Sequence, residues 1–361
     1  MTLHTSFAEL MARLRADGVA TDADTEAVRV ALSASLDDDM PTYLRVLVGL
    51  GAWVATILLI GFFFALRLLD DRNAALAFGA VLIAGATWFR RRAGGDFTRN
   101  AAVAASFAGQ GVIVIALGNH FSSDAPPFIA AALLSAVMIV LMPDVLHRFL
   151  SALICVGATA TALVILRASH ALDITALSTV VVSAWVWRGD VKRRSDELYE
   201  MLVPVGYGLA VGLFGLCLFG AFFAVVGGNS HAPAFGVITT DGVAVALSAL
   251  VLVILREHET SPSGVAGLTI LVVIAVFAML TAKSPGIIIG VAMLLLGFDR
   301  KNLILIELAT AFLVVFGAAN YYNLDLTLLE KSGVLVASGV LCIVARVLVD
   351  KLPGARTEVS S

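Results

Sequence analysis

The chain has 361 residues, of which 60% are hydrophobic and only 14% are charged, and its mean hydropathy is +0.96. Soluble domains average about 45–50% apolar and about 25% charged residues, so this composition excludes a soluble protein and indicates a membrane protein. The formal net charge of -3, from 24 basic and 27 acidic residues, gives no reason to expect a nucleic-acid partner.

The first 41 residues are a mixture of polar and apolar residues and lack the short apolar stretch and the cleavage site of a signal peptide. The first apolar run is therefore expected to be an uncleaved span. Apolar residues recur at helical spacing on both sides of Asp17-Gly18, which predicts two short amphipathic helices. We expect residues 1–41 to form a cytoplasmic segment that lies against the membrane face or the end of the bundle, or that contacts a partner.

Twelve apolar segments follow, and a helical span needs about 20 residues. They are 44–66, 74–89, 101–118, 126–142, 149–166, 171–187, 201–226, 235–255, 264–282, 285–298, 303–319 and 333–349. Two segments, 74–89 and 285–298, are short, so the count is eleven or twelve. The sequence predicts an all-α transmembrane helix bundle over residues 42–352 and a disordered cytoplasmic tail over residues 353–361.

Loop charge discriminates between the two counts, because Lys and Arg concentrate on the cytoplasmic side. With twelve spans and a cytoplasmic N-terminus, 19 of the 24 basic residues are cytoplasmic, and Arg67, Arg72, Arg167, Lys283 and Lys331 lie outside. If segment 285–298 does not cross, the split falls to 15 against 9. We therefore predict twelve spans with both termini cytoplasmic. The short tenth span must then be thin, kinked or shielded by neighbours.

No motif of a common enzyme class occurs. The phosphate-binding GxxxxGK[ST], HExxH, GxSxG and dinucleotide patterns are missing from the sequence. The cysteines Cys155, Cys217 and Cys342 each lie in an apolar run without a CxxC motif. The His and Asp residues of the outer loops lack metal-ligand spacing. We predict no cofactor, no metal and no enzymatic activity.

Glu307 is the clearest ionisable residue inside an apolar segment, and Arg346 lies near the matching cytoplasmic end of the last span. Charged groups inside a membrane cost about 2.5–3.5 kcal/mol on insertion scales, so they are the default functional candidates. We expect Glu307 and Arg346 to form an intramembrane ion pair that fixes helix register. Two alternatives stay open, a proton or substrate site and snorkelling of Glu307 to the interface.

Other intramembrane features suggest helix packing. Gln110 lies in mid-span between Gly109 and Gly111, where its amide needs a partner on another helix. The GxxxG spacings Gly208–Gly212 and Gly286–Gly290 permit close helix approach, although chance matches are expected in a chain with 31 glycines.

The stretch between the last two spans has aromatic, apolar and charged residues in a distinctive order. Tyr321 and Tyr322 are placed where an interfacial aromatic belt is expected, and leucines follow before Lys331. We predict an interface elbow that locks the last two spans together. Its candidate residues are Tyr321, Tyr322, Leu328, Leu329, Lys331 and Ser332.

Several of these elements also carry a family resemblance. They are the turn Ser284-Pro285-Gly286, the ending Leu296-Gly297-Phe298, the paired tyrosines followed by Leu, the run Leu328-Leu329-Glu330-Lys331-Ser332, and Leu50-Gly51-Ala52-Trp53. At these residues the chain resembles the uncharacterised bacterial multi-spanning family catalogued as domain of unknown function 4401, over 41–352. The resemblance implies a bacterial inner membrane. It also implies a second small membrane protein as partner, since family members are often encoded beside one named for a Gly-Asp-Tyr motif. The family has no assigned activity, so no catalytic residue is carried over.

Two functional hypotheses follow. The first is a non-enzymatic component or scaffold of a membrane protein complex, in which the N-terminal helices and the elbow contact a partner. The second is a secondary transporter of a small solute with Glu307 as coupling carboxylate, because short or broken spans are where transporters bind substrate. A transporter should have a polar cavity with Glu307 at its wall, whereas a scaffold should have a packed apolar interior.

Overall fold

The computed structural model describes residues 71–92, 96–118, 121, 123–188, 196–226, 235, 237–257, 265–281 and 284–323, with isolated positions among 51–62 and 332–336. The predicted cytoplasmic segment 1–41, most of the first span, most of the last span and the tail 353–361 lie outside the described residues.

Every element of the described ranges 71–323 is an α-helix. They are α4 (Arg72–Arg92), α5 (Asp96–Gly118), α6 (Ala125–Leu141), α7 (Val145–Ile165), α8 (Ala171–Arg188), α9 (Asp196–Val226), α10 (Val237–Glu257), α11 (Val265–Leu280), α12 (Pro285–Asp299) and α13 (Leu303–Asn323).

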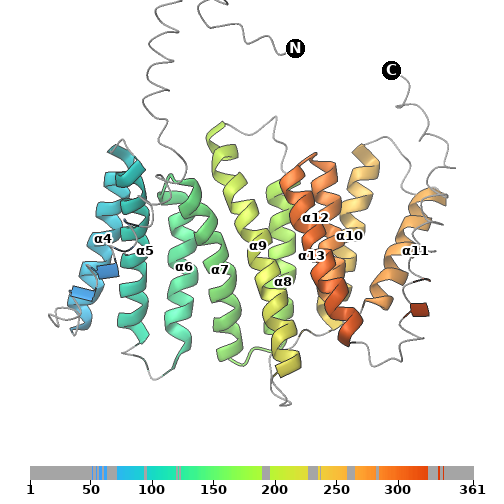
Figure 1. The fold of residues 1–361 in the computed structure, drawn as a ribbon, viewed down its shortest axis with the longest axis horizontal. Helices are drawn as coiled ribbons and strands as arrows, with labels where there is room; N and C mark the ends of the chain where they lie inside the picture. Colours follow the sequence, from blue (N-terminus) through green and yellow to red (C-terminus); the bar gives the residue numbers. More distant parts are fainter. Residues whose placement is uncertain are drawn as a thin grey trace, which may run out of the picture.

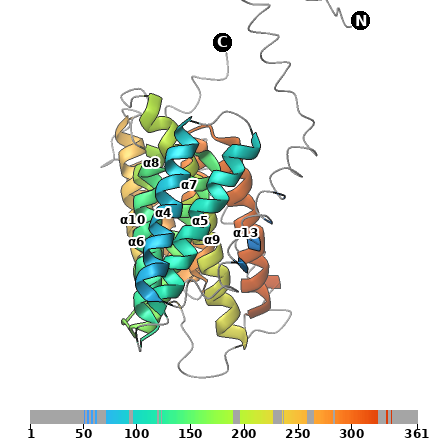
Figure 2. The same cartoon turned by 90° about the vertical axis from the view of Figure 1, so that its left-hand side faces the viewer.

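Consecutive helices run in alternating directions and stand side by side in an elongated array (Figure 1). α4 lies at one edge of the array and α11 at the other (Figure 1). Viewed from the α4 edge, α8 and α10 lie toward one face and α13 toward the other (Figure 2). The largest apolar core joins α7, α8, α9, α10, α11, α12 and α13.

Each of these helices corresponds to a predicted apolar segment, with shifted ends. α4 has 21 residues because the helix continues through Arg90, Arg91 and Arg92, so this segment is not short. α13 continues past Ala319 to Asn323 and includes the backbone of Tyr321 and Tyr322. Charged and aromatic residues extend helices beyond their apolar centres, because backbone hydrogen bonding does not require an apolar side chain.

α12 remains short, with 15 residues, or about 22 Å at 1.5 Å per residue. Pro285 occupies its first turn, where a missing N–H costs no hydrogen bond, and Lys301 has a left-handed backbone, with φ of 51°, just after its end. Its neighbours are α13, α10, α8 and α9. Many of its side chains are buried, among them Ile288, Ile289 and Leu296. The short helix is thus shielded by its neighbours, one of the three options that the sequence left open.

The two GxxxG spacings lie at close helix contacts. A Cβ added at Gly208 would be 2.4 Å from the carbonyl oxygen of Phe149 on α7. A Cβ added at Gly286 would be 2.5 Å from the ring of Phe316 on α13. α9 therefore approaches α7, and α12 approaches α13, at distances that only glycine permits.

Four described helices are long and apolar enough to cross a membrane: Arg72–Arg92, Thr98–Gly118, Val145–Ile165 and Leu198–Ala221. Five shorter apolar helices accompany them: Ala125–Leu141, Ile238–Ile254, Ile270–Met279, Pro285–Asp299 and Leu303–Ala319. Many large apolar side chains face outward, for example Val81, Leu133 and Val245. Such an exposed apolar surface belongs in lipid rather than in water, and the chain is a helical membrane protein.

Basic residues gather at one end of the array. The ends of α4, α8, α10 and α12 and the starts of α5, α7 and α13 meet there (Figure 1). We call it the arginine-rich end; its described basic residues are Arg90, Arg91, Arg92, Arg99, Arg148, Arg188, Arg256, Arg300 and Lys301. Among the described residues, Arg72 and Arg167 are the basic side chains of the opposite end.

Candidate functional site

A buried histidine lies at the centre of a polar cluster between α5 and α7. Asp144 precedes α7, and its Oδ1 accepts a hydrogen bond from the backbone N–H of His147 at 3.1 Å. This N-cap starts the helix at Val145 and places His147 within its first turn. The histidine side chain has no exposed surface.

Both ring nitrogens of His147 have polar neighbours. Nε2 lies 2.9 Å from Ser106 Oγ and 3.5 Å from Gln110 Nε2, both on α5. Nδ1 lies 3.1 Å from Ser151 Oγ, one turn further along α7. The amide nitrogen of Gln110 can only donate, so His147 Nε2 is the acceptor and Nδ1 donates to Ser151. The sequence predicts that Gln110 needs a partner on another helix, and in the structure this partner is His147.

Two further contacts tie this cluster to its surroundings. The ring of Phe107 stacks on that of His147, with centroids 4.4 Å apart and an interplanar angle of 13°. The second carboxylate oxygen of Asp144 accepts a hydrogen bond from Arg90 Nε of α4 at 3.0 Å. We call Arg90, Ser106, Phe107, Gln110, Asp144, His147 and Ser151 the His147 cluster; it connects α4, α5 and α7.

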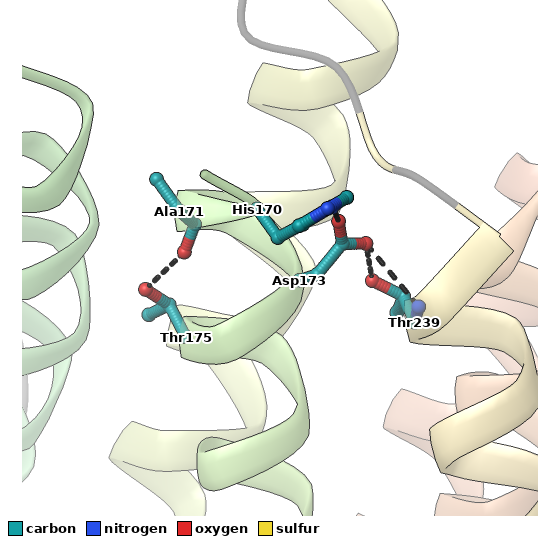
Figure 3. Close-up of polar contacts among 5 residues, drawn as sticks. All are labelled: His170, Ala171, Asp173, Thr175 and Thr239. Atoms are coloured by element: carbon teal, nitrogen blue, oxygen red, sulfur yellow. Dashed lines mark hydrogen bonds and ion pairs between the residues drawn. The ribbon is translucent and has the colours of Figure 1, made fainter. Parts of the chain in front are cut away.

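A second cluster lies near the opposite end of the array, where α8 begins (Figure 3). Asp173 of α8 is 1% exposed, and its Oδ1 accepts hydrogen bonds from the backbone N–H of Thr239 at 3.2 Å and from the Thr239 hydroxyl. Its Oδ2 pairs with Nδ1 of the half-exposed His170 at 3.1 Å. Because Thr239 lies in the first turn of α10, the carboxylate of one helix caps another and meets the positive end of its dipole. We call these three residues the Asp173 cluster.

Polar contacts also join the helices at the arginine-rich end. Arg300 Nη2 donates to the backbone carbonyl of Arg188 at 2.7 Å, which links the end of α12 to the end of α8. Tyr207 of α9 exchanges hydrogen bonds with the side-chain amide of Asn302, at 3.0 and 2.9 Å. Asn302 also caps α13, since its Oδ1 accepts from the backbone N–H of Leu305.

The described interior between α8, α10 and α12 contains a small cavity of about 20 Å³. It is lined by Val180, Ala184, Ala246, Leu247, Leu250, Ala292, Met293 and Leu296. A cavity of this size has room for about one water molecule, but an apolar wall offers it no hydrogen bonds. Glu307 does not line this cavity.

The predicted site residues are only partly described. Glu307 is exposed on α13, and Arg346 lies outside the described residues, so their ion pair stays a prediction. Tyr321 and Tyr322 belong to the last turn of α13, and Ser332 is exposed, whereas Leu328, Leu329 and Lys331 lie outside the described part. The elbow likewise stays a prediction. Among the described residues, no group of three His, Cys, Asp or Glu side chains lies close enough to hold a metal ion.

Sequence reasoning missed the central residues of both buried clusters, His147 and Asp173, although it expected Gln110 to have a partner on another helix. His147 falls before the predicted start of its segment at residue 149, and the N-cap spacing from Asp144 to His147 is the signal that extends the helix over it. Asp173 lies inside a predicted segment and meets the criterion that singled out Glu307, a carboxylate within an apolar helix. The hydrogen-bond partners of the two residues come from distant parts of the chain, which a single sequence does not reveal.

A family model described as Domain of unknown function (DUF4401) matches residues 41–352. The chain belongs to this family. The match covers the range over which the sequence resembles the family, and all the helices and clusters described above lie within it. No curated protein and no solved structure matches the chain. The DUF4401 assignment therefore supports a membrane protein of unknown function.

Proposed function

We propose that this DUF4401 protein is a non-enzymatic component, or scaffold, of a membrane protein complex. One observation carries the proposal: the buried ionisable residues His147 and Asp173 hold helices to each other rather than line an open polar space. Each makes hydrogen bonds to a neighbouring helix. The cavity between α8, α10 and α12 is apolar. A packed interior in which His147 and Asp173 have local hydrogen-bond partners suits a structural role better than solute passage.

We further propose twelve spans with both termini cytoplasmic, in a bacterial inner membrane. The alternation of α4 to α13 and the gathering of basic residues at one end support this topology (Figure 1), since basic residues concentrate on the cytoplasmic side. The arginine-rich end then faces the cytosol. Reporter fusions at the carboxyl tail test this orientation: cytoplasmic reporter activity is expected, and periplasmic activity would contradict it.

In the proposed complex, the N-terminal helices and the elbow contact a second, small membrane protein. The test combines purification in mild detergent with photo-crosslinking in intact cells. A photoreactive residue is placed at one of two exposed positions, Ser332 of the elbow or Val336 four residues after it, which we call the elbow positions. Separate control variants carry it at Val81 on α4 or Leu303 on α13, which are also exposed. A protein that co-elutes stoichiometrically and is crosslinked from the elbow positions but not from the control positions supports the proposal. A clean monomer without an adduct would contradict it.

The secondary transporter is kept as a second candidate on one observation. α12 is short and enclosed by other helices, and it forms a pair with α13, which carries Glu307. Short helices inside a bundle are typical of transporter binding sites. Solute uptake by proteoliposomes that contain the purified protein, lost in the Glu307→Gln variant, would favour this candidate over the scaffold.

A further inference from the structure

One corner of the arginine-rich end exposes an unusual combination of side chains. Trp88, Arg91 and Arg92 lie in the last turns of α4, and Arg99 lies near the start of the adjoining α5. All four side chains are exposed. We call these four residues the basic corner. Among the described helices, α4 is the edge helix of the array (Figures 1 and 2), and the four side chains are exposed there.

The arginines of the basic corner differ from their neighbour Arg90 in their interaction partners. Arg90 is largely buried and forms an ion pair with Asp144. Arg91 donates to the backbone carbonyl of Leu141 at 3.3 Å, which is a neutral partner. Among the described side chains, no carboxylate forms an ion pair with Arg91, Arg92 or Arg99. Within the part of the chain that the structure describes, the corner therefore has a local excess of positive charge.

Arg92 is folded back against the helix rather than extended into water. Its guanidinium carbon lies 4.7 Å from the centroid of the Trp88 ring, a cation–π contact. Exposed tryptophan at the end of a membrane helix sits at headgroup level. The contact thus holds a guanidinium group at the depth where lipid phosphates lie. A guanidinium group donates two parallel hydrogen bonds to a phosphate, which makes arginine the preferred partner of phosphate groups.

We propose that the basic corner binds the headgroup of an anionic phospholipid. The phosphate accepts hydrogen bonds from Arg92 and Arg99, and the acyl chains lie along the exposed apolar surface of α4, where Val81 is 68% exposed. This inference is independent of the proposed role in a complex.

The experiment measures lipid preference through tryptophan fluorescence. The full-length protein is reconstituted in vesicles of phosphatidylglycerol and phosphatidylcholine, with one or the other lipid carrying brominated acyl chains, which quench nearby tryptophans. The Trp88→Phe variant identifies the part of the signal that comes from Trp88. For the wild type, brominated phosphatidylglycerol is expected to quench Trp88 more than brominated phosphatidylcholine at the same mole fraction. Since each arginine near an anionic surface is worth about a fivefold change in binding, the Arg92→Gln/Arg99→Gln double variant should lose most of this preference.

The matched control is the Arg256→Gln/Lys301→Gln double variant, which removes the same charge from exposed positions at the same end of the array but on α10 and after α12. It should keep the preference. Equal quenching by the two lipids in the wild type, or an equal loss in the control, would overturn the proposal. Glycerol phosphate in solution should leave the preference unchanged; if it abolishes the preference, the corner is a site for soluble phosphates and the lipid assignment is wrong.

Discussion

Gly79 of α4 and Gly109 of α5 face each other where the two helices cross. A Cβ added at Gly79 would lie 2.8 Å from the carbonyl oxygen of Gly109, and one added at Gly109 would lie 2.7 Å from the carbonyl oxygen of Gly79. Each backbone is therefore in contact with the other. In lipid, where no hydrophobic force drives helices together, such close approach is a main source of association.

Substitution of Gly79 by alanine tests this crossing. The new methyl group would meet both the Gly109 carbonyl and Ile113 Cγ1, the latter at 2.6 Å, so α4 must move away from α5. The free energy of unfolding is expected to fall by about 1–3 kcal/mol. Gly85→Ala on the same helix is the control, since its Cβ meets no atom within 4 Å. This variant should be as stable as the wild type or more stable by up to about 1 kcal/mol. Circular dichroism during titration with sodium dodecyl sulfate measures both; equal effects would contradict the close crossing.

The Ser106–His147 contact is tested by a double-mutant cycle. His147→Phe keeps a ring that can stack on Phe107 but leaves Ser106 and Ser151 without their buried partner. The loss of stability is expected to be about 1–3 kcal/mol. Ser106→Ala in the His147→Phe background should cost less than in the wild type, by about 0.5–1.5 kcal/mol, because the hydrogen bond is already absent. Additive effects of the two substitutions would show that the contact contributes nothing to stability.

Asp144 has two roles that two substitutions separate. It caps α7 through His147 N–H and pairs with Arg90. Asp144→Asn retains a capping oxygen but loses the charge, whereas Asp144→Ala loses both. We expect the alanine variant to be less stable than the asparagine variant by about 1 kcal/mol, the usual worth of an N-cap. If the ion pair with Arg90 accounts for the stability that Asp144→Asn loses, Arg90→Gln should lower the stability by a similar amount. Added to the Asp144→Asn variant, Arg90→Gln should then have little further effect.

Hydropathy predicted the positions of the helices but not their ends or their contacts. The sequence predicts a short segment at 74–89 because Arg90, Arg91 and Arg92 have very low hydropathy and therefore resemble a loop. Those arginines extend α4 because charged side chains are tolerated at an exposed helix end. Basic residues are also favourable at the carboxyl-terminal end of a helix, which is the negative end of the helix dipole. The enclosed position of α12 depends on four neighbouring helices, which no local pattern specifies.

The polar clusters were hidden for a related reason. Ser106 and Gln110 are 41 and 37 residues from His147 in sequence, and Asp173 is 66 residues from Thr239. Each residue alone has a plausible local role, as a small polar residue in a helix or a charged residue at a helix end. Only the tertiary fold, which brings side chains of α5 to His147 and packs α8 against α10, brings them together. Gln110 was the exception, because a mid-span amide requires a partner wherever that partner comes from.

Asp173 provides a test of the cap that one helix forms on another. Asp173→Ala removes the acceptor for the backbone N–H and the hydroxyl of Thr239, and we expect a loss of about 1.5–3 kcal/mol, the usual range for hydrogen bonds to charged groups. Asp173→Asn should lose less, since its amide oxygen can still accept. Asp241→Ala is the matched control, because Asp241 lies two residues after Thr239 on α10 and its side chain is exposed. A control as unstable as Asp173→Ala would indicate a general effect of charge removal at this end.

Glu307 is the residue on which the two functional candidates differ, and its predicted partner is Arg346. If the pair fixes helix register, Glu307→Leu and Arg346→Leu should each lower stability, and the double variant should lose less than their sum by about 0.5–3 kcal/mol. Glu307→Leu combined with Arg256→Leu is the control, because Arg256 is an exposed arginine of α10 for which no pairing with Glu307 is expected. Its effects should add. Coupling of Glu307 to Arg346 favours the scaffold, since a carboxylate engaged in an ion pair is not available to exchange protons with a solute. Absence of coupling removes the pair and leaves Glu307 as an exposed carboxylate, whose role the proteoliposome assay then decides.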